Sequence, residues 1–516
     1  MPAPHSLPAP RCPAADPIAL TTKLMRLLHR TLIHARNMST KAGFTTYPRM
    51  TAPSKIPDPL APNRPLFPLL PHPEETAPPA PPRPELAPPP AGWTRSYHAA
   101  PAAYPKELAE AHGTLSRDST PYKTAEAKAG ETKEEKAARF TADAINSVEM
   151  RYAVHNWTYA EVQAALPRGH WLAAERWRRD KPTGRGKVLV CTHANGLQKE
   201  HWHVALRALL ARDPTTPGAV FGTAAELPPT SVEIDDIWLL DDANHAASVD
   251  LNAGRLGAVQ AWRDDSRDVL NFVTHVLPNV YAGEGRPGWQ LGWSANPAPM
   301  PKVVGIGHSF GGNALVQAAA ARPDLFESLF LVDPMVPPHY VPYDRWLKER
   351  LAVYALSAGA IRRRTHWPSR ADAAKAMRAQ PFFAAWDKEV FDLYVAHGLV
   401  PVDYSKPEGE VTLATPSWCE AAVFTEPEGV AHGWMALSKL TCPVGFVMAN
   451  VPVATYGEER TRDMVWRPPR ARNERFPDAG HLITQEKPHK LAESMWRFFT
   501  TIDAGVWDKD DDRAKL

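Results

Sequence analysis

The stretch Pro301-Lys-Val-Val-Gly-Ile-Gly-His-Ser-Phe-Gly-Gly-Asn313 decides the fold. The apolar, β-branched run at 303–306 predicts a buried strand, and the alanine-rich run at 314–321 predicts a helix. Between them, Gly307-His-Ser-Phe-Gly311 fits G-x-S-x-G, the pattern of a nucleophilic serine on a sharp strand-to-helix turn. Such a turn needs flanking residues without bulk, and it places the Ser309 hydroxyl at a helix start, where negative charge is stabilised. The stretch therefore predicts a strand, a serine at the apex of a turn, and a helix.

Buried apolar runs alternate with helical stretches on both sides of this turn. Alternation of this kind predicts βα units and a mostly parallel sheet with helices on both faces. The expected strands are residues 187–192, 232–240, 303–306, 328–332, 442–448 and 473–476, and residues 151–154 and 171–177 are expected to form two early antiparallel strands.

A long insertion follows Asp333. About a hundred residues separate it from the next expected strand, whereas a plain βα unit needs about 30. Helical stretches at 343–358, 369–380 and 386–397 predict a helical cap over residues 335–440, above the site edge of the sheet. Most of its aromatic side chains are expected to pack on one another; they are Tyr340, Trp346, Trp367, Phe382, Phe383, Trp386, Phe391 and Tyr394.

The chain before residue 148 divides into two segments. Residues 1–50 are poor in acids and contain a basic amphipathic pattern at 18–36, which is typical of a mitochondrial transit peptide. Because Met38 can serve as a second start, a non-functional extension is the alternative. Residues 51–147 are rich in proline and then in charge, which predicts a disordered linker. We expect the globular core to cover 148–334 and 441–503, followed by a tail at 504–516.

Composition excludes several classes of protein. The formal net charge is +2, from 59 basic and 57 acidic residues, so no global field favours nucleic acid. No run of 18 apolar residues occurs, which argues against a membrane span. The four cysteines show no paired spacing, which indicates reduced thiols in an intracellular compartment; they are Cys12, Cys191, Cys419 and Cys442.

A serine hydroxyl needs a base to take its proton. His481, in Phe476-Pro-Asp-Ala-Gly-His-Leu482, follows the last expected strand and has the right chain order for that base. An acid should orient the imidazole, and Asp333 or the pair Glu458 and Glu459 can supply it. We favour Asp333, because Arg460 stands where the usual arrangement after the strand at 442–448 has an aspartate.

The developing negative charge needs hydrogen-bond donors. The backbone N–H of Phe310 is one candidate, and the N–H of Asn195, in His193-Ala-Asn-Gly196, is the other. His193 itself is expected to fix this loop. The expected chemistry requires no metal and no organic cofactor.

Five segments together resemble one family, the fungal α/β-hydrolases that include the yeast peroxisomal lipase and hydrolases of host-selective toxin biosynthesis. The similarity covers residues 148–499. The resemblance implies an α/β-hydrolase core with a helical cap, a serine nucleophile, and esterase- or lipase-like activity on hydrophobic esters. The segments are Cys191-Thr-His-Ala-Asn-Gly-Leu-Gln-Lys-Glu200, residues 241–245, Gly307-His-Ser-Phe-Gly-Gly312, Trp367-Pro-Ser-Arg370 and Gly480-His-Leu-Ile-Thr-Gln-Glu-Lys-Pro488.

The chain ends in Ala514-Lys515-Leu516. This tripeptide is similar to Ser-Lys-Leu, an address read by the peroxisomal import receptor. A peroxisomal enzyme is therefore expected, with the mitochondrion as the alternative if the N-terminal segment is used.

These observations predict a capped serine hydrolase that cleaves a hydrophobic carboxylic ester, or a thioester, through an acyl-enzyme. An acyltransferase on the same fold is one alternative, because it uses the same intermediate with another acceptor. A non-catalytic adaptor that docks a partner through the proline-rich arm is a second alternative, since a fold does not fix a function.

Overall fold

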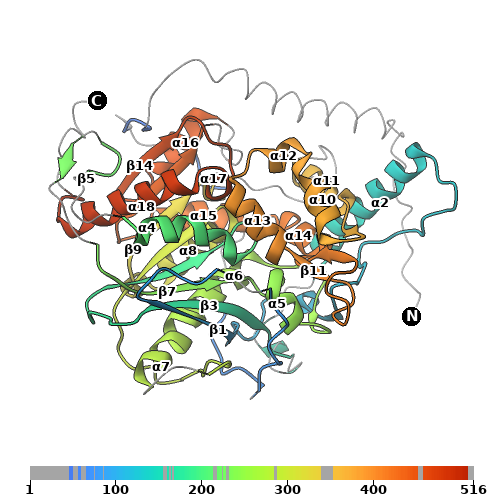
Figure 1. The fold of residues 1–516 in the computed structure, drawn as a ribbon, viewed down its shortest axis with the longest axis horizontal. Helices are drawn as coiled ribbons and strands as arrows, with labels where there is room; N and C mark the ends of the chain where they lie inside the picture. Colours follow the sequence, from blue (N-terminus) through green and yellow to red (C-terminus); the bar gives the residue numbers. More distant parts are fainter. Residues whose placement is uncertain are drawn as a thin grey trace, which may run out of the picture.

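A computed structural model describes residues 46–49, 56–59, 65–74, 76–84, 87–154, 158, 160–161, 164, 168–212, 218–223, 225–227, 232–283, 288–338, 352–450 and 457–508. Its centre is an eight-stranded sheet in the order β1-β3-β7-β4-β8-β9-β13-β14 (Figure 1). β3 runs antiparallel to both of its neighbours, and the six strands from β7 to β14 run parallel. The strands are β1 (Trp93–Pro101), β3 (Trp171–Arg179), β4 (Lys187–Thr192), β7 (Ile234–Leu240), β8 (Val303–His308), β9 (Phe326–Val332), β13 (Val444–Ala449) and β14 (Ala471–Phe476).

Two hydrophobic cores cover the two faces of the sheet. Alternate residues of β4 enter different cores: Val188 and Val190 the first, Leu189 and Cys191 the second. This follows from the two-residue period of a strand, and it explains why the strand reads as a continuous apolar run. The expected α/β-hydrolase architecture is confirmed. Against the first face lie α6 (Trp262–Asn271), η3 (Phe272–Val276), α7 (Leu277–Ala282), α8 (Phe310–Ala321), α15 (Gly429–Leu437) and α16 (Glu458–Val465), and against the second lie α4 (His203–Leu210) and α18 (Pro488–Asp503).

The insertion after β9 is a cap with its own core. Trp367, Trp386, Phe391 and Tyr394 are buried together, so the expectation that the cap aromatics pack on one another is met for these residues. The cap also holds a three-stranded sheet, which the expectation of a helical cap missed because its strands are only two or three residues long. Tyr340, Trp346 and the start of the helix expected at 343–358 lie outside the described residues. The cap elements are α10 (Ala352–Arg362), α11 (Arg370–Arg378), α12 (Pro381–Ala384), α13 (Lys388–His397), α14 (Ser417–Phe424), β10 (His366–Trp367), β11 (Leu399–Pro401) and β12 (Val411–Leu413).

The core begins well before residue 148, so the predicted boundary is wrong. β1 is the edge strand of the main sheet and pairs with β3 along its whole length. The helix α2 (Lys133–Tyr152) starts at a capping box between Thr132 and Glu135, and in Figure 1 it lies beside the orange cap. Residues 151 and 152 end this helix instead of forming the expected strand. Charge dominates this helix, and only its narrow apolar stripe marks it as part of a packed structure.

Parts of the proline-rich segment also lie against the core, so the prediction of a disordered linker is wrong for these parts. The Arg263 side chain donates to the Pro65 carbonyl at 2.6 Å, and Arg267 donates to the carbonyls of Phe67 and Pro68 at 3.1 and 3.0 Å. A proline residue has no N–H but keeps its carbonyl oxygen. Core arginines can therefore bind a proline-rich segment through its carbonyls, although a neighbouring strand could not pair with it along a ladder.

Two sequence expectations concern regions that the structure describes only partly. Within the described residues, no helix combines the length and the apolar character needed to span a bilayer. Cys191, Cys419 and Cys442 are buried free thiols, and Cys12 lies outside the described residues. The predicted targeting pattern at 18–36, Met38 and the C-terminal Ala514-Lys515-Leu516 lie outside them as well.

Candidate active site

Ser309 stands alone between the end of β8 and the start of α8. Its backbone has φ 55° and ψ −117°, a strained conformation for a residue with a Cβ. The Ser309 N–H donates to the Val332 carbonyl at 2.9 Å, which holds the turn against β9. The predicted strand, turn and helix are all present.

The two glycines of the G-x-S-x-G pattern are sterically required. A Cβ added at Gly307 would lie 2.7 Å from the Gly312 Cα, and a Cβ at Gly311 would lie 2.5 Å from the His193 carbonyl oxygen. Both contacts are with backbone atoms, which cannot give way without opening the turn. The pattern therefore follows from the close approach of α8 to β8 and to the loop after β4.

Three residues from three different strand ends meet at this turn. His481 lies in the loop after β14, and its Nε2 is 2.8 Å from the Ser309 Oγ. The His481 Nδ1 is 2.6 Å from the Oδ2 of Asp333, which directly follows β9. Asp333 is almost fully buried, whereas the His481 side chain keeps 19% exposure. The structure thus brings together the three residues that the sequence analysis favoured.

The order of these contacts sets the protonation pattern. A buried carboxylate can only accept, so the His481 Nδ1–H donates to Asp333. The His481 Nε2 then carries a lone pair, which accepts the Ser309 hydroxyl proton. This is the arrangement in which an imidazole acts as a general base on a hydroxyl.

The alternative acids lie elsewhere. Glu458 begins α16, its side chain is 66% exposed, and it pairs with Arg475 at 3.3 Å. Glu459 is exposed on the first turn of the same helix. Asp333 is held by the sheet itself, because its N–H donates to the Val447 carbonyl of β13 at 2.8 Å.

His308, the residue before the serine, was missed by the sequence analysis. Its Nε2 donates to the backbone carbonyl of His481 at 2.9 Å, and its Nδ1 accepts from the Thr484 hydroxyl at 3.3 Å. Burial holds the pKa of His308 well below the ordinary value, so the ring is neutral and supplies one donor and one acceptor. β8, which leads to Ser309, therefore also holds the loop that carries His481, through the hydrogen bond of His308. A polar residue at the buried end of an apolar strand was the available signal.

The loop after β4 lies against the start of α8. The Gly311 N–H donates to the His193 carbonyl at 3.1 Å, and the Thr192 hydroxyl donates to the Gly311 carbonyl at 2.9 Å. Phe310 is the first residue of α8, so its N–H has no acceptor within the helix. The two predicted oxyanion positions, Phe310 and Asn195, thus come from two segments that are hydrogen-bonded to each other.

The side chain of Asn195 has a structural role of its own. It donates from Nδ2 to the Glu420 carbonyl of the cap at 3.1 Å, and the next N–H, of Gly196, donates to the His245 Nε2 at 2.9 Å. His193, as expected, fixes the loop: its Nε2 accepts from the Asp242 N–H at 3.2 Å. The predicted oxyanion donor of Asn195 is its backbone N–H.

Comparison with solved structures identifies the fold. The chain superposes on the peroxisomal α/β-hydrolase Lpx1 of Saccharomyces cerevisiae with a TM-score of 0.50, over 81% of this chain and 90% of that one, at 16% sequence identity. The chain has the α/β-hydrolase fold.

Sequence comparison supports the same fold and the resemblance stated above. The abhydrolase domain-containing protein AFT2-1 of Alternaria alternata is 29% identical over 236 residues, 40% of this chain and 86% of that protein. The peroxisomal membrane protein LPX1 of Saccharomyces cerevisiae is 32% identical over 32% of this chain and 35% of that protein. The type I acyl-CoA thioesterase mpaH of Penicillium roqueforti is 26% identical over 40% of this chain and 38% of that protein. No model of a protein family matches the chain. These α/β-hydrolase relatives support a hydrolase.

Proposed function

We propose that this α/β-hydrolase is a serine hydrolase that cleaves carboxylic esters or thioesters through an acyl-enzyme. One observation carries the proposal: the His481 imidazole bridges the Ser309 hydroxyl at 2.8 Å and the Asp333 carboxylate at 2.6 Å. A hydroxyl, an imidazole and a carboxylate in this order make a nucleophile with its base and its orienting acid.

The first half of the proposed reaction acylates the serine. The Ser309 Oγ attacks the substrate carbonyl carbon while its proton passes to the His481 Nε2, and Asp333 stabilises the imidazolium. The N–H groups of Phe310 and Asn195 hold the oxyanion of the tetrahedral intermediate. The intermediate collapses when the bond to the leaving oxygen or sulfur breaks, and His481 returns its proton to that leaving group.

The second half removes the acyl group. His481 takes a proton from water, whose oxygen attacks the acyl carbon. The bond to the Ser309 Oγ then breaks, and the same proton restores the hydroxyl. The products are a carboxylic acid and an alcohol or thiol, so no oxidant, metal or organic cofactor is consumed. An acyltransferase would differ only in the acceptor that replaces water.

The substrate class follows from the cap and from the relatives. The cap is rich in aromatic residues, and this composition favours a hydrophobic acyl or alcohol group. One relative is named an acyl-CoA thioesterase, which makes acyl thioesters a specific candidate beside oxoesters. Turnover of a series of p-nitrophenyl esters and acyl-CoA thioesters of increasing chain length, with free acid as the readout, separates the two.

Covalent labelling tests the nucleophile. A fluorophosphonate probe should label Ser309, and Ser309→Ala should lose both labelling and turnover, by a factor of about 10⁴ or more. A Ser309→Ala protein that hydrolyses the same esters at the wild-type rate would refute the assignment. Absence of labelling in the folded wild-type protein would instead favour the non-catalytic adaptor.

We also propose delivery to peroxisomes through Ala514-Lys515-Leu516, read by the import receptor. The relative named a peroxisomal membrane protein supports this destination. The test is the localisation of forms that start at Met1 and at Met38, each with and without the last three residues. Cytosolic retention of the Met38 form would defeat the proposal, and mitochondrial import of the Met1 form would favour the alternative.

A further inference from the structure

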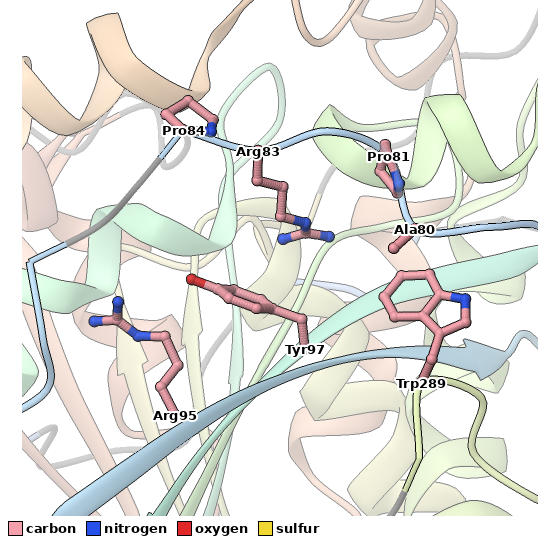
Figure 2. A pocket seen from close by; sticks show the side chains of 7 residues that line it. All are labelled: Ala80, Pro81, Arg83, Pro84, Arg95, Tyr97 and Trp289. Atoms are coloured by element: carbon pink, nitrogen blue, oxygen red, sulfur yellow. The ribbon is translucent and has the colours of Figure 1, made fainter.

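A pocket lies beside β1, the edge strand of the main sheet. Residues 76–84, which we call the proline strap, cross over Tyr97 of β1 and over Trp289 (Figure 2). The strap contains Pro78-Pro-Ala-Pro-Pro-Arg-Pro84. Consecutive prolines fix φ and restrict the residues before them, so such a run adopts a polyproline II helix. This conformation is stiff before it binds, which lowers the entropy cost of docking.

The strap is bound through its backbone by a tryptophan. The Trp289 Nε1 donates to the Pro78 carbonyl at 2.8 Å, and the Ala77 N–H donates to the Gln290 Oε1 at 2.7 Å. A polyproline II helix makes no internal hydrogen bonds, so its carbonyls are free to accept from such side chains. Aromatic-lined grooves are the general means by which proteins bind these segments.

The arginine of the strap is bound by an aromatic ring and faces an acid. Figure 2 shows Arg83 directed toward Tyr97, and its guanidinium carbon lies 4.7 Å from the ring centroid. The Arg83 Nη1 is 4.0 Å from the Oε1 of Glu200, a buried carboxylate in the short helix η2 (Lys199–Trp202). The same oxygen also pairs with the Lys199 Nζ at 2.7 Å. Pro78, Pro81 and Arg83 thus fit the spacing P-x-x-P-x-R. Trp289 binds the carbonyl of Pro78, Tyr97 and Glu200 face Arg83, and Pro81 lines the pocket between them.

The contact is made by a few anchors and not by a close-packed interface. A cavity of about 390 Å³ remains between the strap and the side chains of Arg95, Tyr97 and Trp289. Pro79, Pro82 and Pro84 face solvent. Of the strap residues, only Ala77 packs against a buried hydrophobic cluster, so release of the rest of the strap breaks few apolar contacts.

We propose that Tyr97, Trp289 and Glu200 form a recognition site for polyproline II segments of the pattern P-x-x-P-x-R, and that the chain's own strap is its resident, displaceable ligand. The strap therefore occupies this site on its own domain. A second P-x-x-P-x-R segment can bind only after the strap has dissociated. This inference is independent of the chemistry at Ser309.

Peptide binding to the full-length protein tests the proposal. The probe is a fluorescent peptide with the sequence of residues 76–84, and binding is measured by anisotropy. Wild type should bind it weakly, because the tethered strap competes at a high effective concentration. The double variant Pro81→Ala/Arg83→Ala, whose strap has lost the second proline and the arginine of the motif, should bind the peptide at least tenfold more tightly.

Two matched controls make the result specific. Adding Trp289→Phe to the double variant keeps an aromatic ring but removes the indole donor, and it should reverse the gain. A probe peptide with alanine in place of its arginine should bind the double variant at least fivefold more weakly than the original probe. The proposal fails if the double variant binds no more tightly than wild type, or if both probes bind equally. Should the double variant not fold, Arg83→Ala alone is used, with the same two outcomes.

Discussion

Two groups of buried polar side chains in this molecule invite comparison: the site at Ser309 and a cluster around α6. The α6 cluster is held by ion pairs, of which Lys106 with Asp268 at 2.8 Å and Arg267 with Asp264 at 2.7 Å are the shortest. These ion pairs join buried side chains of the protein to one another. In the site at Ser309, by contrast, the contacts run in one direction, from a buried acid through a partly exposed imidazole to a hydroxyl.

This difference shows that a shifted carboxyl pKa does not by itself mark the candidate active site. Burial raises the pKa of Asp265, on α6, well above its ordinary value, and it raises the pKa of Asp242, whose backbone N–H donates to His193, to about 6. Each has an oxygen without a hydrogen-bond partner among the described residues. A search for perturbed carboxyl groups alone would therefore stop at a structural cluster. What distinguishes the site is a series of contacts that ends on the hydroxyl of Ser309.

The largest expected effect separates the two acids that the sequence left open. Asp333→Asn should lower turnover about 10⁴-fold, because the amide favours the wrong imidazole tautomer and does not stabilise its cation. Glu458→Gln is the matched control and should leave ester turnover unchanged, since Glu458 contacts Arg475 and not His481. Equal losses in the two variants would contradict the assignment of the acid.

The next largest effect is expected in the α6 cluster, and it should appear in the free energy of unfolding. Lys106→Met leaves Asp268 as an uncompensated buried charge and should cost about 3–5 kcal/mol in the free energy of unfolding. Denaturant unfolding measures this loss. Labelling of Ser309 per folded molecule should stay at the wild-type level, and a selective loss of labelling would show that the two groups are coupled. Pairing Lys106→Met with Asp268→Asn should recover part of the stability.

The pH dependence of the free energy of unfolding provides a third test. The pKa of Asp242 rises from 3.8 in the unfolded chain to about 6 in the fold, mainly through burial. The native state therefore binds more protons between these values, and stability falls as pH rises from about 4 to about 6. The loss amounts to at most about 3 kcal/mol. Asp242→Asn should flatten this part of the curve, as measured by urea unfolding from pH 4 to 7.5; an unchanged slope would contradict the role of Asp242.

The smallest effect concerns His308. His308→Leu removes the donor to the His481 carbonyl and should lower kcat about 10- to 100-fold through misplacement of the base. His308→Gln retains an N–H donor of similar reach and should keep more of the activity. If the Leu variant loses stability but keeps kcat per folded molecule, then His308 only packs and does not position the base.

Much of the site was predictable because its signals are local. The glycines around Ser309 report a backbone turn, and chain order assigns His481 to the loop after the last strand. Asp333 followed from the sequence only by elimination at Arg460, whereas the structure shows its 2.6 Å contact directly. His308 escaped notice because its partner is a backbone carbonyl 173 residues away.

The N-terminal region was the main failure, and its cause is also physical. β1 pairs with β3 across a separation of about 80 residues, so nothing local reports the partner. The proline-rich parts are ordered by the side chains of Arg263, Arg267 and Trp289, which supply the donors that a proline-rich backbone lacks. Composition shows that a proline-rich segment lacks hydrogen-bond donors of its own. It does not show which donors the rest of the chain supplies.

The position of Asp333 has a further consequence for how this lineage can change. Asp333 and Ser309, the proposed acid and nucleophile, stand at the ends of two adjacent strands, β9 and β8, so one ladder aligns two of the three proposed groups. If Asp333 is the acid, as proposed, the segment that opens α16 need not supply a carboxylate, and Arg460 can stand there. A sequence pattern that demands a carboxylate at this point would miss the contacts that join Ser309, His481 and Asp333 in this chain.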